Sequence, residues 1–182
     1  MDNERLQKQM EFCRLIDAEK LIGRQTYLAD ASRKENDAEH AWHMAVMTLL
    51  LSEYSNEEID VLKTVSMLLI HDLVEIYAGD TYASDEEANK TQKDRELAAA
   101  DRLFGVLPKD QQDKLRGLWE EFEAAESAEA KFAHTMDNIQ PLMLNCASDG
   151  RSWEEKQVKL SQILGRNERT KDGSEELWDF AY

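Results

Sequence analysis

The feature that most constrains the fold is residues 61–70, a stretch that is apolar nearly all round a helix. A helix without a polar face is buried on most sides by neighbouring elements. We therefore expect a central helix that begins at Ser55 or Asn56 and runs to about Ala78. Because no strand-like alternation, internal repeat or linker occurs elsewhere, the sequence predicts one all-α domain over residues 1–182, a bundle of about six to eight helices.

The other expected helices follow from apolar spacing, capping residues and the positions of glycine and proline. Residues 24–36 have no clean period and indicate a loop, and Pro141 is expected to bend or open its helix. A stripe of methionines is expected in the core, and it consists of Met44, Met47, Met67, Met136 and Met143. The expected helices cover residues 4–22, 37–54, 84–105, 108–125, 127–142 and 153–164, and a short C-terminal tail docks its aromatic side chains on the bundle.

The composition excludes several classes of protein. Hydrophobic residues make up 42% of the chain, with two prolines and seven glycines, which argues against a disordered or fibrous protein. The formal net charge is −16, from 22 basic and 38 acidic residues, and it would repel a nucleic acid. No uncharged apolar run is long enough to span a membrane. The acidic N-terminus is unlike a secretory signal, and Cys13 and Cys146 are expected to be reduced core thiols, so we expect a cytoplasmic protein.

A set of metal-binding residue types gathers around the central helix. His71 and Asp72 follow the apolar run directly, and burying them is costly unless an ion compensates. His40 and Asp137, on two other expected helices, complete a set of two imidazoles and two carboxylates. This set suits one divalent transition metal ion, Mn²⁺, Fe²⁺, Co²⁺, Ni²⁺ or Zn²⁺, with Mg²⁺ as a further option. Positions left open on such an ion could take a water and a substrate oxygen, and the water could attack phosphorus.

Further polar residues lie near these candidates in the sequence. Glu75 is four residues after His71, hence on the same side of a helix, where it could orient a water or transfer a proton. Arg24 and Arg33 precede the His40 region, where basic groups would help to hold an anion. His43 is one turn after His40 and is expected to contact the substrate or the side chains around the metal.

The order of these segments resembles one known family. The matching pieces are residues 33–40, residues 71–75 with the following Gly79 and Asp80, and residues 128–132 leading to Asp137. Over about residues 24–145 the chain resembles the HD-domain phosphohydrolases, and within them the branch of bacterial 5′-deoxynucleotidases and their eukaryotic relatives. Residues 150–182 are expected to form a C-terminal helical extension, and the region from Asn145 to Tyr182 is similar to a less characterised bacterial branch of the same family.

The resemblance implies roles for individual residues. It makes His40, His71, Asp72 and Asp137 the metal ligands and Glu75 the catalytic acid or base. It also places Asp80 near the sugar or the leaving oxygen, and Arg33 or Arg24 near the phosphate.

The resemblance also implies a reaction, and one segment departs from the family pattern. The expected enzyme is a metal-dependent phosphohydrolase that cleaves (deoxy)nucleoside 5′-monophosphates to nucleoside and phosphate, and that forms a homodimer. The deoxynucleotidases carry an Arg-Trp-like pair before the first ligand, whereas here Arg24 is followed by Gln25, Thr26 and Tyr27. Arg24 therefore carries over and Tyr27 is a substitute, which leaves the choice between deoxyribose and ribose open.

Two alternatives stay open from the sequence. Another HD hydrolase could act on a nucleoside triphosphate or an alarmone, although the lack of a long basic region disfavours triphosphates. A non-catalytic binding module could keep the metal for stability alone. Retention of Glu75 and Asp80 speaks against the second alternative, because a structural metal site needs neither residue.

Overall fold

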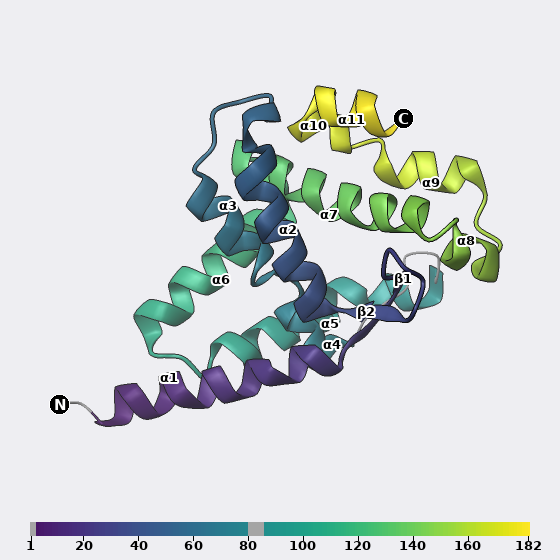
Figure 1. Ribbon diagram of the computed structural model, residues 1–182. Helices are drawn as coiled ribbons and strands as arrows, with labels where there is room; N and C mark the ends of the chain where they lie inside the picture. The colour runs from purple at the N-terminus through teal and green to yellow at the C-terminus, as the bar shows by residue number, and fades with distance from the viewer. Residues whose placement is uncertain (1–2, 80–85) are drawn as a thin grey trace.

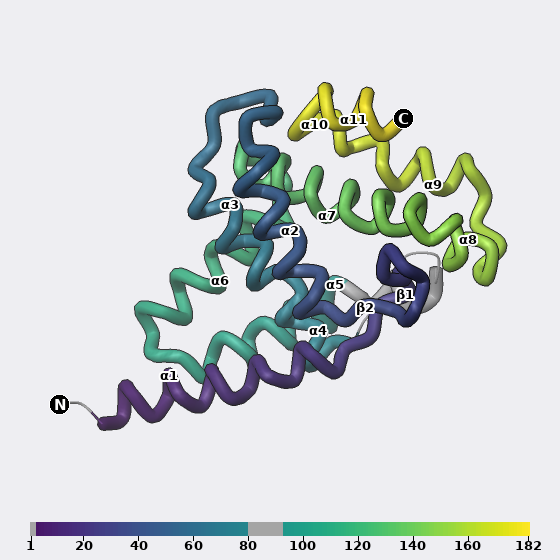
Figure 2. Tube along the Cα trace, viewed as in Figure 1, coloured from purple at the N-terminus to yellow at the C-terminus, as the bar shows by residue number. Residues whose placement is uncertain are grey.

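The chain forms a helical bundle with one small β-hairpin, which confirms the all-α prediction (Figure 1, with the chain trace in Figure 2). The structure, a computed structural model, describes residues 3–79 and 86–182, with side chains in all of these except 86–92. The helices are α1 (Asn3–Leu15), α2 (Asp37–Leu51), α3 (Val61–Leu68), α4 (Glu75–Ala78), α5 (Glu86–Phe104), α6 (Lys109–Ala124), α7 (Ala128–Ala147), α8 (Arg151–Lys156), α9 (Leu160–Asn167), α10 (Thr170–Gly173) and α11 (Glu175–Ala181). Three 3-10 helices, η1 (Ile16–Leu21), η2 (Ser52–Tyr54) and η3 (His71–Val74), and two strands, β1 (Gly23–Tyr27) and β2 (Lys34–Asn36), join them.

The segment expected to be a loop is instead a hairpin. β1 and β2 pair antiparallel, with Gly23 opposite Asn36 and Tyr27 opposite Lys34. The strands are too short to show an alternating pattern in the sequence, so their pairing depends on the turn and on their neighbours. Ala31 adopts a left-handed conformation in that turn, with φ of 56°. The hairpin leads directly into α2 and thereby sets where that helix begins.

The expected central helix is divided into three pieces. α3 begins only at Val61, where the Asp60 side chain accepts a hydrogen bond from the backbone N–H of Lys63. It ends at Leu68 and is followed by η3 and α4. Adjacent side chains on a regular helix diverge by about 100°. The 3-10 turn at His71 departs from this regular spacing, and three of its four side chains, His71, Leu73 and Val74, are buried.

Several predicted helix ends also differ from the structure. The first helix ends at Leu15 and continues as η1, and the helix expected over residues 153–164 is divided into α8 and α9 by Gln157, whose φ is 53°. Asn36, rather than Asp37, caps α2. Its side chain accepts a hydrogen bond from the backbone N–H of Glu39, and the Glu39 carboxylate accepts one from the backbone N–H of Asn36. Asp37 is thereby buried in the first turn. The predicted cap of α7 by Ser127 is confirmed, and that helix continues through Pro141.

Two apolar clusters form the core, and the elements that carry the metal candidates belong to both. One cluster joins α5 to η3 through Leu103, Phe104 and Leu73. The other joins α2, α3 and α7, and its members include Met44, Met47, Met67, Phe132 and Met136. The methionine prediction is confirmed for Met44, Met47, Met67 and Met136 and wrong for Met143, which is 42% exposed. Cys13 and Cys146 are free, as expected, but both are exposed rather than buried.

The C-terminal segment docks on α7 through small and polar groups. The backbones approach so closely that a Cβ on Gly173 would lie 2.4 Å from the carbonyl oxygen of Lys131. Thr135 donates to the carbonyl of Thr170, and Leu177 is buried against the core. The expected docking of the terminal aromatic side chains is wrong for Phe180, which is 90% exposed. None of the helices within residues 3–79 and 86–182 has the length and apolar character that a membrane crossing requires.

Candidate metal centre

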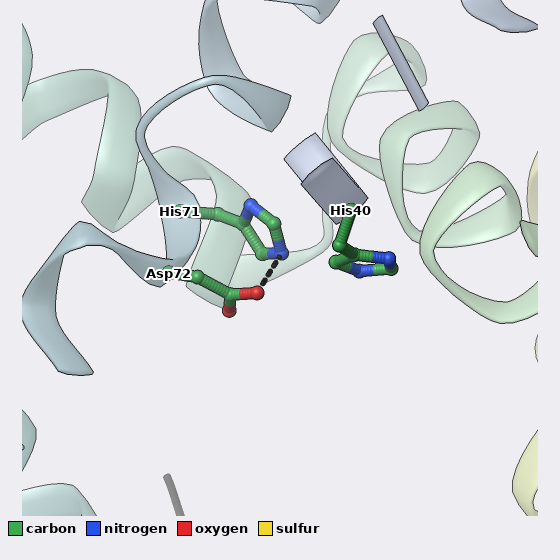
Figure 3. Close-up of side chains that lie close together, drawn as sticks. All are labelled: His40, His71 and Asp72. Carbon is green, nitrogen blue, oxygen red and sulfur yellow. Dashed lines mark ion pairs between the residues drawn. The ribbon is translucent and has the colours of Figure 1, made fainter. Parts of the chain in front are cut away.

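Three elements that are far apart in the sequence bring four polar side chains to one point. His40 comes from the first turns of α2, His71 and Asp72 from η3, and Asp137 from the middle of α7. Figure 3 shows the first three side chains together, and one ligand atom from each lies within 4.8 Å of the others. The Oδ1 atom of Asp137 lies 3.0 Å from Nε2 of His40 and 3.9 Å from Nε2 of His71. All four residues expected as ligands are therefore adjacent.

Both imidazoles are oriented by a hydrogen bond at the nitrogen that faces away from this point. Nδ1 of His71 donates to the carbonyl oxygen of Leu68 at 2.9 Å, because a carbonyl can only accept. Nδ1 of His40 faces Oε1 of Gln140 at 2.8 Å, and the amide nitrogen of Gln140 donates to Glu35 at 2.9 Å. Since a carboxylate accepts, Gln140 must turn its oxygen toward His40, which then donates. Both rings thus carry a proton on Nδ1 and aim Nε2 at the carboxylates, as metal-binding imidazoles do.

The electrostatics of the centre favour a bound cation. Burial opposes ionisation of Asp72 and Asp137, but the imidazoles and Arg24 hold the pKa of each carboxyl well below its usual range. Burial alone would lower the pKa of His71, but Asp72 and Asp137 outweigh it and raise this pKa to about 9. A proton shared between an imidazole nitrogen and a carboxylate oxygen offsets only part of the negative charge of Asp72 and Asp137. A divalent ion in the same place would bind all four atoms, so the residues present fit a metal.

Arg24 lies directly beside the four candidate ligands. Its guanidinium is 2.8 Å from Asp72 and 3.1 Å from Asp37, and a third carboxylate, that of Glu35, lies 3.6 Å from its Nε. Burial alone would lower the pKa of Arg24, but these carboxylates and Asp137 raise it above its ordinary value. The side chain is only 14% exposed, so it is a fixed positive charge at the edge of the centre.

The other predicted site residues differ in their positions and contacts. Glu75 begins α4, one turn after His71 and on the same chain segment. His43 is half-buried, and its Nδ1 lies 3.2 Å from the amide nitrogen of Gln140. Arg33 is exposed and pairs with Glu39 at 2.8 Å, so it does not contact the ligands in this conformation.

Two further predicted site residues are Tyr27, which lies at the margin of the centre, and Asp80, which is not among the described residues. The Tyr27 hydroxyl donates to Glu155 of α8 at 2.7 Å, and its ring lies under the guanidinium of Arg151. Asp80 lies outside the described residues, so its predicted role near the sugar stays a prediction.

Two residues that support the imidazoles were not predicted from the sequence. Gln140 is one turn after Asp137 on α7, and Glu35 ends the hydrogen-bond chain that begins at His40. Both are fully or nearly fully buried polar residues. The spacing of Gln140 from Asp137 was a usable signal, because residues three apart on a helix share a face. No comparable signal pointed to Glu35.

Fold and site together define the class of this chain as an HD-domain hydrolase. The chain belongs to the HD-domain family: the model of that family, described as "HD domain", matches residues 16–178. The resemblance drawn from the sequence motifs is therefore confirmed.

Relatives and a solved structure agree with that membership. The chain is 31% identical to the 5′-deoxynucleotidase HDDC2 of Bos taurus over 155 residues, which cover 85% of this chain and 73% of that protein. It is 30% identical to the human protein of the same name, covering 85% and 74%. A crystal structure described as a predicted metal-dependent phosphohydrolase from Magnetospirillum magnetotacticum MS-1 is similar with a TM-score of 0.93 and 46% identity, covering 98% of this chain and 89% of the other.

Proposed function

We propose that this chain is a metal-dependent phosphomonoesterase that cleaves (deoxy)nucleoside 5′-monophosphates to nucleoside and phosphate. The observation that carries the proposal is the convergence of His40, His71, Asp72 and Asp137, with both Nε2 atoms aimed inward. The relatives named 5′-deoxynucleotidase support the nucleotide as substrate. A phosphohydrolase described as metal-dependent has nearly the same fold, which supports the metal.

The four side chains would hold one divalent transition metal ion. Two imidazole nitrogens and two carboxylate oxygens form a donor set that suits Mn²⁺, Fe²⁺, Co²⁺, Ni²⁺ or Zn²⁺. When bound, such an ion polarises a phosphoryl oxygen and lowers the pKa of a coordinated water. Gln140 and the carbonyl of Leu68 keep His40 and His71 in the tautomer that this requires.

The remaining residues act on the substrate and on protons. Arg24 lies beside Asp72, where its guanidinium would donate hydrogen bonds to the phosphate once a bound metal offsets the surrounding carboxylates. We assign to Glu75 the removal of a proton from the attacking water and its return to the leaving oxygen. Water adds to phosphorus, the bond between phosphorus and the sugar oxygen breaks, and that oxygen gains the proton. The motif assigns Asp80 to the sugar.

The proposed enzyme acts as a homodimer in the cytoplasm. α2 turns large apolar side chains outward, with Trp42, Leu49 and Leu50 64%, 64% and 68% exposed. Such a stripe on a helix favours contact with a second copy of the chain. Light scattering would measure the molar mass in solution. A monomer that persists at high protein concentration would contradict the proposed homodimer. The free cysteines agree with a reducing compartment.

One panel of substrates tests the function. With Mn²⁺, Co²⁺ or Zn²⁺ added, we expect phosphate release from nucleoside and deoxynucleoside 5′-monophosphates, and loss of activity after chelation. Glu75→Gln should lower kcat by about 10²- to 10⁴-fold because it removes the proton transfer. Glu53→Gln, an exposed substitution in η2, is the matched control.

Other outcomes of the panel would change or remove the proposal. Release from triphosphates or an alarmone alone would assign a different substrate to the same centre. Metal binding without hydrolysis of any phosphate ester would leave a binding module. Wild-type rates in Glu75→Gln would remove that residue from the reaction.

A further inference from the structure

A cavity of about 600 Å³ opens from the metal centre toward the C-terminal helices. Arg24 and Asp137, which belong to the centre, also line this cavity at one end. α8 and α9 form the opposite wall, with Trp153, Gln162 and Arg166 among the lining side chains. The volume lies in the range that small-molecule sites occupy in proteins. A ligand whose phosphate lies at the metal centre would therefore extend into this space.

The walls of the cavity are held in place by polar contacts. Ser152 at the start of α8 donates to the side chain of Asn145 on α7, and Asn145 donates to the carbonyl of Pro141. On the other side of α8, Glu155 accepts from Tyr27 of the hairpin. α8 thus contacts both α7 and β1, and Figure 1 shows it at the end of α7 beside the hairpin. Because the walls are already held in place, little conformational entropy of the protein is lost when a ligand binds.

The lining of the cavity has the chemistry of a site for a flat, hydrogen-bonding ring. The indole of Trp153 is half-buried and packs near the backbone at Gly150, 3.4 Å from where a Cβ would be. Side-chain amides recur around the wall, and they include Gln25, Asn138, Asn145, Gln157, Gln162 and Asn167. An aromatic face provides stacking, and amides both donate and accept hydrogen bonds. A ring with polar edges would use both.

The charges of the lining separate this cavity from the rest of the surface. Three lining residues are basic and one, Asp137, is acidic, whereas acids outnumber bases 38 to 22 in the whole chain. Arg24 is already paired with carboxylates. Arg166 has no carboxylate partner among the residues that the structure describes. Because a guanidinium only donates hydrogen bonds, Arg166 calls for a ligand with acceptor atoms, such as the oxo group or ring nitrogen of a base.

We propose that this cavity binds the nucleobase of the substrate, with Trp153 as its stacking surface and Gln162 and Arg166 as contacts to its polar edge. The proposal rests on the proposed function and extends it, because it assigns substrate choice to α8 and α9. A nucleobase is joined to the phosphate through the sugar, so it must lie one sugar away from the metal. The cavity reaches from Asp137 at the centre to the residues of α8 and α9, where a base at that position could lie.

A comparison of two substrates tests the proposal. 2-Deoxyribose 5-phosphate has the phosphate and sugar of a deoxynucleoside 5′-monophosphate but no base. We expect kcat/KM of the metal-loaded wild type to be higher for the nucleotide. Trp153→Ala should lower the ratio of the two kcat/KM values about tenfold, mainly through KM of the nucleotide, because stacking on an aromatic side chain is lost. Gln162→Ala and Arg166→Ala, both at exposed positions, should lower the ratio several-fold.

Control variants and binding measurements separate the possible failures. Arg14→Ala, an exposed arginine on α1, should keep the wild-type ratio. A variant that merely weakens the fold lowers both values and leaves the ratio unchanged, and that result for all three cavity variants overturns the proposal. If the wild type hydrolyses neither substrate, the proposed function fails, and calorimetry with a free deoxynucleoside tests the cavity directly. Binding to the wild type that Trp153→Ala and Arg166→Ala lose supports the proposal, and absence of binding overturns it.

Discussion

At the scale of single residues, the candidate metal centre depends on the hydrogen bond that Nδ1 of each imidazole donates on the side away from the carboxylates. His71 uses a backbone carbonyl for this purpose, whereas His40 uses the side chain of Gln140. The backbone carbonyl of Leu68 remains when its side chain is substituted, whereas substitution of Gln140 removes the partner of His40. The amide also links His40 to Glu35, so its loss would remove a hydrogen bond from each of two buried polar groups. Gln140 is therefore a positioning residue whose effect should be visible in metal binding.

The first prediction concerns this residue. Gln140→Leu should weaken divalent metal binding by about 10- to 100-fold, because His40 loses the bond that fixes its tautomer and orientation. Titration calorimetry with Zn²⁺ or Co²⁺ measures the change. Gln112→Leu on α6, an element that carries none of the four candidate ligands, serves as the matched control. Equal affinities for the two variants would show that Gln140 does not orient His40.

The second prediction concerns Glu19, a buried carboxyl in η1. Burial, together with the charges of Asp72 and Asp37, raises its pKa from 4.5 to about 7. A carboxyl with a raised pKa stabilises the fold fully below its unfolded-state pKa, and this contribution is lost as the pH rises through the folded-state value. The free energy of unfolding of the wild type should therefore fall from about pH 4.5 to about pH 7 on account of this group.

Glu19→Gln removes this dependence. At pH 8 the variant should be more stable than the wild type by on the order of 2 kcal/mol, while near pH 4.5 the two should be equal. Urea unfolding of chelator-treated protein at both pH values measures the difference. Glu11→Gln on the exposed side of α1 is the control. A stability difference that does not change with pH would contradict the raised pKa.

At the scale of elements, the sequence predicts what depends on local pattern and misses what depends on tertiary contacts. The cap of α7 at Ser127 could be predicted, because capping and amphipathic spacing are local signals. The break between α3 and η3 could not, because residues 61–78 favour one continuous helix. Packing against α5 and α7, and the turn that directs His71 inward, override that preference. The hairpin was missed because strands of five and three residues have no measurable period.

The same distinction applies to the candidate site. The motif residues His40, His71, Asp72 and Asp137 could be named from the sequence, and they lie together. Arg33 carries the same kind of local signal as Arg24, yet the hairpin turns it toward Glu39 and turns Arg24 toward Asp72. Which of two nearby arginines faces the centre is decided by the register of β1 and β2, which the sequence does not reveal.

The third prediction concerns the contact between α10 and α7. Gly173→Ala should destabilise the protein by about 1–3 kcal/mol, because its Cβ would overlap the backbone of α7. Gly117→Ala on α6 meets nothing within 4 Å and should be neutral or stabilising by about 1 kcal/mol. Urea unfolding of both variants gives the comparison. Equal stability of the two would show that the C-terminal segment does not pack on α7 as described.

At the scale of the whole molecule, the candidate metal would connect elements that belong to different parts of the bundle. α2 and α7 pack in one apolar cluster, while η3 joins the other. An ion held by His40, His71 and Asp137 would bridge both clusters. Because such an ion binds the folded chain and not the unfolded one, its binding free energy adds to the stability of the entire fold.

The fourth prediction follows from this linkage. At a free metal concentration about 100 times Kd, the gain is about 2.7 kcal/mol, which for a chain of this size raises Tm by about 5–10 °C. Removal of the metal with a chelator should lower Tm by that amount in the wild type and in Asp179→Asn, an exposed control in α11. In Asp137→Asn the shift should shrink, because the ion keeps only three of its four protein ligands. Equal shifts in Asp137→Asn and in the control would mean that the stabilising ion binds elsewhere, since loss of a true ligand must weaken the connection between α7 and the rest of the centre.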